Sequence, residues 1–285
     1  MAITKVTTPG LIDLPTTISS VETNTDGVVL PKGTTAQGAA LTAVDRGEFR
    51  YNTTTKKVEY YDGADWFTLD SSTIVPQSGT TGACNYPITA SGLFQLENNI
   101  DNTCGGGTPS QNGNITFTTS EKKFGTYSAV FSDNGKLDTA IAPGTGDWSV
   151  SLWLNPDTEG YFGGTTDGSV QYGIYMYGYT SGTIQLQNRD TGTISNLSVS
   201  GILPFGSWTH VVITYSSNLT TLYTDGSSRG TLSGNPTHST NFIFGQSGNY
   251  APSGDLYDGY MDQIRIFPTT LTATQVGYLY TETAP

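Results

Sequence analysis

Residues 207–215 read SWTHVVITY, and residues 222–226 follow with LYTDG. Further along, residues 259–267 read GYMDQIRIF, and residues 271–280 read LTATQVGYLY. β-Branched and aromatic residues dominate the first three stretches, which predicts strands. In the last stretch Thr272 and Gln275 have the spacing of a capping box, which predicts a helix. The order is therefore two strands joined by a turn, another strand and one short helix.

The preceding sequence continues this pattern back to residue 83. Candidate strands recur about every ten residues between turns rich in Gly and Asn, which is typical of a two-sheet sandwich. Residues 148–154 alternate strictly and place Trp148, Val150, Leu152 and Leu154 on one face. In the order and identity of the residues quoted above, residues 83–285 resemble a concanavalin A-like jelly-roll lectin domain of the laminin-G type. The resemblance implies an all-β fold, an antiparallel two-sheet jelly-roll sandwich that presents loops for binding and has no catalytic apparatus by itself.

The first part of the chain reads differently. Residues 1–32 show no sustained periodicity and contain several prolines, which predicts an extended arm that a partner must order. Residues 33–75 hold three short runs separated by turns, which predicts a small β-meander that is marginal alone and packs on copies of itself or on a host structure. Its expected apolar positions are Phe49, Tyr51, Val58, Tyr60, Trp66 and Leu69. Residues 76–82 are expected to form a linker.

Three segments of this meander are similar to one family of viral proteins. Residues 33–37 read GTTAQ, residues 50–55 read RYNTTT, and residues 59–63 read EYYDG before Trp66. Together they resemble a segment common in tail-fibre and other virion structural proteins of tailed bacteriophages. The resemblance implies a protein assembled in the host cytoplasm, exposed on the virion, and attached to capsid or tail proteins through residues 1–75. It also implies a homo-oligomer, often a trimer, and leaves tail fibre and capsid decoration equally open.

The composition narrows the classes of partner. The chain has 285 residues and a formal net charge of −12, so binding to nucleic acid or to an anionic membrane is not expected. No apolar run reaches the roughly 18 residues that a membrane span needs. The N-terminus shows no cationic segment before an apolar core, so no signal peptide is expected. This disfavours a second candidate function, a free secreted lectin.

The chain has two cysteines, Cys84 and Cys104. A disulfide between them would close a loop of about 20 residues and stabilise the fold by roughly 3 kcal/mol. Two free thiols are the alternative, since the chain is made in the cytosol. We favour the bond because a virion must survive outside cells.

Catalysis is not expected. Enzymes of this architecture that hydrolyse glycans use two carboxylates on one strand, usually in the pattern Glu-x-Asp-x-x-Glu, to flank the scissile bond. None of the glutamates of the jelly-roll region, Glu97, Glu121, Glu159 and Glu282, stands in that pattern. His210 lies inside a strand and His238 in a polar loop, which gives no zinc spacing. A polysaccharide-degrading enzyme nevertheless remains an alternative function.

Calcium is the one cofactor that the sequence leaves open. Ca²⁺ takes six to eight oxygen ligands, and loops at the edge of a sandwich can converge them. The related domains often hold one such ion. The candidate ligands are Asp133, Asn134, Asp255, Asp258 and Asp262. Turn formation by Asp and Asn explains each of them without a metal.

Carbohydrate is the expected ligand on the host surface. Sugars offer an apolar face rimmed by hydroxyls, so a sugar site needs an aromatic platform with amides and carboxylates nearby. The candidate binding residues are Tyr161, Tyr177, Tyr179, Asn249, Tyr250 and Tyr257. Some of these tyrosines would also fit a plain sheet surface or a protein–protein contact.

Overall fold

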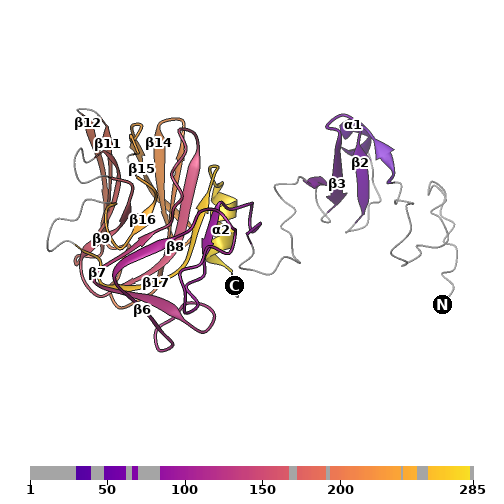
Figure 1. The fold of residues 1–285 in the computed structure, drawn as a ribbon. Coiled ribbons are helices and arrows are strands. Elements are labelled where there is room, and N and C mark those ends of the chain that lie inside the picture. Colours follow the sequence, from indigo (N-terminus) through magenta and orange to yellow (C-terminus); the bar gives the residue numbers. More distant parts are fainter. Residues whose placement is uncertain are drawn as a thin grey trace, which may run out of the picture. The chain divides into compact units, whose positions relative to one another are not determined.

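The computed structural model describes residues 30–39, 48–61, 66–69, 84–166, 172–190, 193–238, 240–248 and 256–282. The chain forms two compact units, Met1–Gln77 and Ser78–Pro285 (Figure 1). The expected arm, apart from its last residues, and the expected linker lie outside the described residues. Within the described part of the chain, no helix has the length and apolar character needed to cross a membrane.

The first unit holds a small sheet. Strands β1 (Lys32–Gly33), β2 (Phe49–Asn52), β3 (Lys57–Tyr61) and β4 (Trp66–Leu69) lie in this order, and the short helix α1 (Thr35–Ala39) connects β1 toward β2. The antiparallel neighbours β2, β3 and β4 are the three strands that the sequence predicts for the meander. The structure adds β1, which pairs with β2 in parallel.

The buried face of this small sheet is polar, which the sequence analysis did not anticipate. Arg50, Asn52 and Glu59 are buried, whereas the side chain of Phe49 is 49% exposed. Side chains alternate between the two faces of a strand, so the polar and the apolar residues of β2 and β3 point in opposite directions. The alternation of polar and apolar residues in the sequence indicates that the sheet has two different faces. It does not show which of the two faces is buried.

Trp66 lies on the opposite face of the sheet from Phe49, Tyr51, Val58 and Tyr60. Trp66 pairs with Tyr61 and therefore lies on the polar face, where the Arg50 guanidinium is 4.5 Å from the centre of its ring. Leu69 is three positions away on the same strand. Residues separated by an odd number of positions point to opposite faces, so the two cannot share one.

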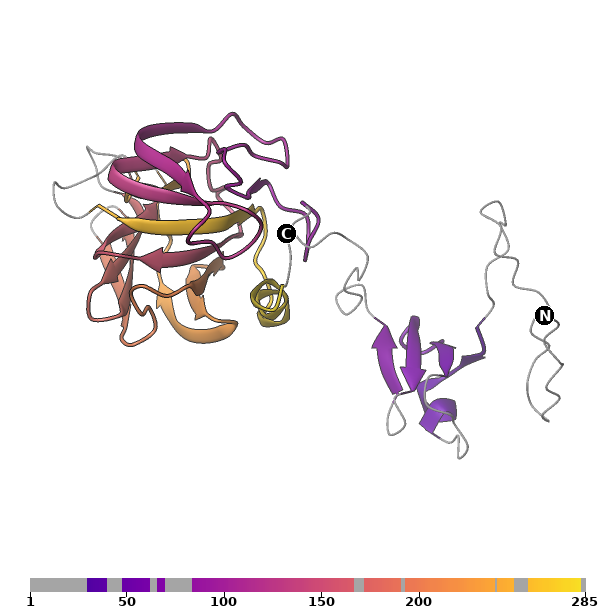
Figure 2. The same cartoon turned by 90° about the horizontal axis from the view of Figure 1, so that it is seen from below.

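The described residues of the second unit form thirteen strands and one helix. These are β5 (Gly92–Phe94), β6 (Ser110–Thr118), β7 (Ser128–Asp138), β8 (Trp148–Pro156), β9 (Gly160–Gly164), β10 (Gly173–Tyr179), β11 (Thr183–Asp190), β12 (Thr193–Val199), β13 (Thr209–Ser216), β14 (Leu219–Thr224), β15 (Ser227–Ser233), β16 (Ile243–Phe244), β17 (Gly259–Phe267) and α2 (Ala273–Tyr280). Hydrogen bonds connect the strands into one antiparallel sheet, in the order β12-β11-β10-β9-β16-β7-β17-β8-β13-β14-β15. The sheet folds over itself until β12 contacts β15. This arrangement confirms the all-β, antiparallel jelly-roll sandwich (Figure 2).

The core lies between the layers and follows the predicted alternation. Trp148, Val150, Leu152 and Leu154 of β8 all belong to the core cluster. The opposite face of β8 is buried as well, because α2 and the segments that flank it cover it. Ser149 accepts a hydrogen bond there from the backbone N–H of Leu271 (2.9 Å).

Helix α2 has the predicted capping box. The Thr272 hydroxyl accepts a hydrogen bond from the backbone N–H of Gln275, and the Gln275 side chain accepts one from the backbone N–H of Thr272. The ring of Tyr280 stacks on that of Trp153, at 6.0 Å between centroids. The helix is therefore held on the outside of the sandwich (Figure 2).

Cys84 and Cys104 form a disulfide, with their Cα atoms 5.4 Å apart. The bond closes a loop that contains β5, and β5 pairs with β17 in the middle of the sheet. It therefore holds the first described segment of the second unit against the sandwich.

Candidate functional site

The outer face of β9, β10 and β11 combines a row of tyrosines with a row of polar side chains. Along β10 and β11, the residues Ile174, Met176, Ile184 and Leu186 point into the core. The alternate residues point outward. We call this outward surface the tyrosine–amide face; it consists of Tyr161, Tyr175, Tyr177, Tyr179, Gln185, Gln187 and Arg189.

The tyrosines of this face lie in mutual contact. The rings of Tyr161 and Tyr177 meet edge to face with centroids 4.7 Å apart, and those of Tyr177 and Tyr179 are 4.5 Å apart. Tyr161 also lies 5.7 Å from Tyr175. The structure thus brings together three of the six residues predicted to bind carbohydrate, since β9 and β10 are neighbours with Tyr161 opposite Tyr177.

Hydrogen bonds order the polar row beside the tyrosines. The Tyr179 hydroxyl donates to Gln185 Oε1 (3.1 Å), and Gln187 Nε2 donates to the same oxygen (3.0 Å). Arg189 donates to Gln187 Oε1 through Nε (3.1 Å) and Nη2 (2.8 Å), and its guanidinium lies 4.2 Å from the centre of the Tyr175 ring. These side chains are therefore held in place before any ligand arrives.

Sequence reasoning missed the polar row. Gln185, Gln187 and Arg189 have the same spacing of two residues as Tyr175, Tyr177 and Tyr179. That shared period was the available signal, because two adjacent strands with the same alternation present their outward residues on one surface.

The members of the face differ in exposure. Tyr175 and Tyr177 are only 1% and 7% exposed. Tyr161, Tyr179, Gln185 and Gln187 are half-buried. A ligand would therefore contact Tyr161, Tyr179 and the amides, while Tyr177 supports the two outer rings from between them.

Tyr257 was wrongly predicted as a binding residue. Its side chain is 2% exposed within the core, its ring packs edge to face on Phe131 at 6.2 Å, and its hydroxyl donates to the carbonyl of Tyr260 (2.8 Å). A residue enclosed in this way cannot contact a ligand. Asn249 and Tyr250 lie outside the described residues.

The candidate calcium ligands separate into two places. Asp133 and Asn134 occupy left-handed backbone positions within β7. Burial, and then the charges of Asp133 and Asp157, raise the pKa of Asp258. Asp255 lies outside the described residues. The described part of the chain contains no group of three or more His, Cys, Asp or Glu side chains positioned to hold a metal.

Asp262 does not belong with the other candidate calcium ligands. It is fully buried, and its Oδ2 accepts hydrogen bonds from the backbone N–H groups of Lys123 and Phe124, both at 3.0 Å. Burial raises its pKa to about 7, although these hydrogen bonds act in the opposite direction. Because its accepting oxygen holds the loop before β7 against β17, Asp262 has a structural role.

The jelly-roll glutamates also serve structure. Glu97 accepts hydrogen bonds from the backbone N–H groups of Thr126 and Tyr127, at 3.0 and 3.1 Å. Glu159 accepts from the backbone N–H and hydroxyl of Thr180. These carboxylates hold loops together and do not reproduce the arrangement of a hydrolase motif.

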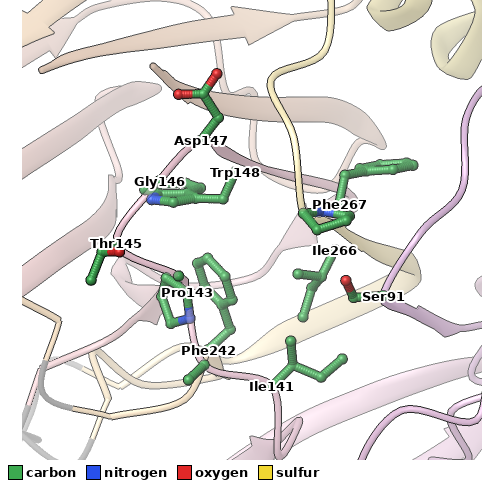
Figure 3. A pocket seen from close by; sticks show the side chains of 13 residues that line it. Ser91, Ile141, Pro143, Thr145, Gly146, Asp147, Trp148, Phe242, Ile266 and Phe267 are labelled. Carbon is green, nitrogen blue, oxygen red and sulfur yellow. The ribbon is translucent and has the colours of Figure 1, made fainter. Parts of the chain in front are cut away.

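A cavity of about 310 Å³ lies at another place in the second unit (Figure 3). In Figure 3, the side chains of Ile141, Pro143, Trp148, Phe242 and Ile266 surround it, while the Asp147 carboxylate points away. Its walls are mostly apolar, so it offers a sugar few hydrogen-bonding groups. The tyrosine–amide face is the better candidate for a polar ligand.

Comparison with protein families identifies the second unit. Residues 110–277 match the model of the concanavalin A-like lectin/glucanases superfamily. The chain belongs to this superfamily. Residues 7–83 match a second model, described as a phage tail like trimerisation region. The two matches support a phage tail-type protein with a jelly-roll domain. Comparison with curated proteins found no match.

Several solved structures share the fold. One is domain 4 of AbnA, a GH43 extracellular arabinanase from Geobacillus stearothermophilus, in complex with arabinotriose, with 18% identity and a TM-score of 0.51 over 67% of this chain and 98% of that one. Another is the binding domain of Paraclostridial Mosquitocidal Protein 1, with 16% identity and a TM-score of 0.54 over 66% and 51%. A third is the Botulinum Neurotoxin Type G receptor binding domain, with 13% identity and a TM-score of 0.52 over 67% and 50%. At these identities the likeness shows the fold, and the second and third of these structures are described as binding domains.

Proposed function

We propose that this superfamily member is a trimeric attachment protein of a phage-like tail. Residues 1–75 fix it to the particle, and the jelly roll presents the tyrosine–amide face to carbohydrate on the host surface. One observation carries the proposal: a single chain joins a trimerisation-region match to a lectin-type sandwich. The tail-type match favours a tail fitting over a capsid decoration. The similar arabinanase domain, which was solved with arabinotriose, supports carbohydrate as the ligand class.

The face offers what a neutral sugar ring needs. Tyr161 and Tyr179 can pack against the apolar side of the ring, as aromatic side chains do with other flat apolar groups. The amides of Gln185 and Gln187 can exchange hydrogen bonds with the rim of hydroxyls. The chain's net charge of −12 disfavours strongly anionic polysaccharides. Three copies in one trimer would raise the avidity of a weak individual contact.

The Tyr179→Ala substitution tests this site. We expect it to weaken glycan binding by roughly tenfold or more, because removing a central aromatic contact typically costs about 2 kcal/mol. The measurement is a glycan array with the wild-type protein, followed by titration calorimetry of each hit with the variant. Tyr179→Phe should retain more affinity than Tyr179→Ala, since it keeps the ring and loses only the hydroxyl.

The matched control is Tyr223→Ala. Tyr223 is also a half-buried tyrosine, but it lies on β14, away from the tyrosine–amide face. Equal losses in the two alanine variants would contradict the site. An array without hits, together with unchanged adsorption of particles that lack the protein, would remove carbohydrate attachment from the proposal.

A further inference from the structure

The sheet of the first unit buries three polar or charged residues and leaves its described apolar side chains half-buried or exposed. Among the side chains of residues 30–69 that the structure describes, none that is apolar is buried. The buried ones are Arg50, Asn52 and Glu59. Burial of apolar surface is the main favourable contribution to folding. The described side chains of this unit therefore do not form a hydrophobic core within one chain.

The polar face is already occupied. Arg50 Nε and Nη2 donate to Glu59 Oε2 at 2.9 and 2.6 Å, and Asn52 Nδ2 donates to Glu59 Oε1 at 2.7 Å. Helix α1 lies directly on this group, since a side chain at Gly38 would overlap the Arg50 guanidinium. Arg50 also donates to the carbonyl of Thr34 (3.2 Å). This side of the sheet is therefore covered by α1 of the same chain.

The opposite face is apolar on β2 and β3. Register pairs Phe49 with Tyr60 and Tyr51 with Val58. It continues to β4, where Tyr60 pairs with Phe67 and Val58 with Leu69. We call Phe49, Tyr51, Val58 and Tyr60, with the register positions 67 and 69, the apolar face. Its strands place no charged residue on it, although the chain as a whole is strongly acidic.

We propose that the apolar face is the trimer interface, and that three such faces pack around a threefold axis to form the core that one chain lacks. This inference rests on the trimeric state in the proposed function and adds the surface that produces it. The occupant is a second and third copy of the same chain, because the described strands lie within residues 7–83, the part that matches a trimerisation region. An uncharged face also allows identical acidic chains to meet without repulsion.

The buried ion pair gives this interface its direction. Arg50 and Glu59 are both buried on the polar face. If that face packed at the threefold axis instead of the apolar face, two charged side chains from each chain would be enclosed in the trimer core. Buried polar groups of this kind are known to fix the register and state of an assembly at some cost in stability. The sheet therefore has one face suited to association and one that disfavours it.

The Val58→Glu substitution in the full chain tests the interface. The wild-type chain should have a mass three times 30.3 kDa by light scattering after size exclusion, and the variant should fall to 30.3 kDa. Three carboxylates would otherwise have to be buried together near the axis, which is strongly unfavourable. The matched control, Thr55→Glu, adds the same charge at an exposed turn position between β2 and β3 and should remain a trimer.

A second variant distinguishes the loss of the interface from simple unfolding of the first unit. Val58→Cys is nearly neutral in size, and a short bis-maleimide should cross-link it between chains far more than Thr55→Cys. The native cysteines form a disulfide and do not compete. A monomeric wild-type chain would remove the trimer from the proposed function. A trimer that survives Val58→Glu and does not cross-link through Val58→Cys would overturn the apolar face alone.

Discussion

Glu282→Gln lowers the free energy of unfolding of the jelly-roll unit by about 3–5 kcal/mol, because it leaves a buried arginine without its counter-charge. Arg265 of β17 donates to both carboxylate oxygens of Glu282, at 2.6 and 2.8 Å. The two side chains are only 2% and 1% exposed. Urea unfolding of the full chain, followed by tryptophan fluorescence, measures the loss.

Replacing both partners provides the control. The double variant Arg265→Met with Glu282→Leu removes both charges and fills the space with apolar groups, so its loss should be clearly smaller than that of Glu282→Gln. The pair also anchors the chain just after α2 to the sheet. Equal stability of Glu282→Gln and wild type would mean that the arginine finds another partner or water.

Asp262→Asn and His210→Gln change the pH dependence of stability in opposite directions. The pKa of Asp262 is raised by burial to about 7 from 3.8, so its contribution to stability is lost as the pH rises from about 4 to about 7. The pKa of His210 is lowered to about 3 from 6.5 by burial and by the charges of Arg265 and Lys123. Its contribution is lost as the pH falls below 6.5.

The two contributions nearly cancel between pH 4 and 6.5 in the wild-type protein, since each changes by about 1.4 kcal/mol per pH unit at most. Compared with the wild-type protein, Asp262→Asn should therefore lose more stability on acidification, and His210→Gln should lose less. The pKa of His238 is lowered to about 4 by burial, so this residue also reduces stability as the pH falls below 6.5. It does so in the wild-type protein and in both variants. Calorimetric melting temperatures from pH 4.5 to 7.5 show the two slopes. Slopes that deviate from the wild-type slope in the same direction in both variants would contradict this assignment.

The regular parts of the second unit were predictable from sequence. The alternation from Trp148 to Leu154 and the capping box at Thr272 depend on neighbours in the chain, and both occur as expected. The burial of Asp262 and Tyr257 could not be predicted in this way. It depends on the loop before β7 and on the core side of the sheet, which come from distant parts of the sequence.

The candidate site, too, could be predicted from the sequence only in part. The spacing of Tyr177 and Tyr179 indicates one face of one strand, but only the pairing of β9 with β10 brings Tyr161 beside them. In the first unit, the sequence indicated apolar positions but not which face of the sheet is buried. Sequence could not show that Gly38 allows α1 to cover the polar one.

The bond between Cys84 and Cys104 determines how mechanical load enters the jelly roll. In the attachment role proposed above, tension arriving from the N-terminal side would pass through the sulfur atoms directly to Cys104. The intervening loop with β5 is bypassed, so its pairing with β17 does not bear the force. An adhesin that links a moving particle to a cell would thus resist peeling from that end for as long as the bond stays oxidised.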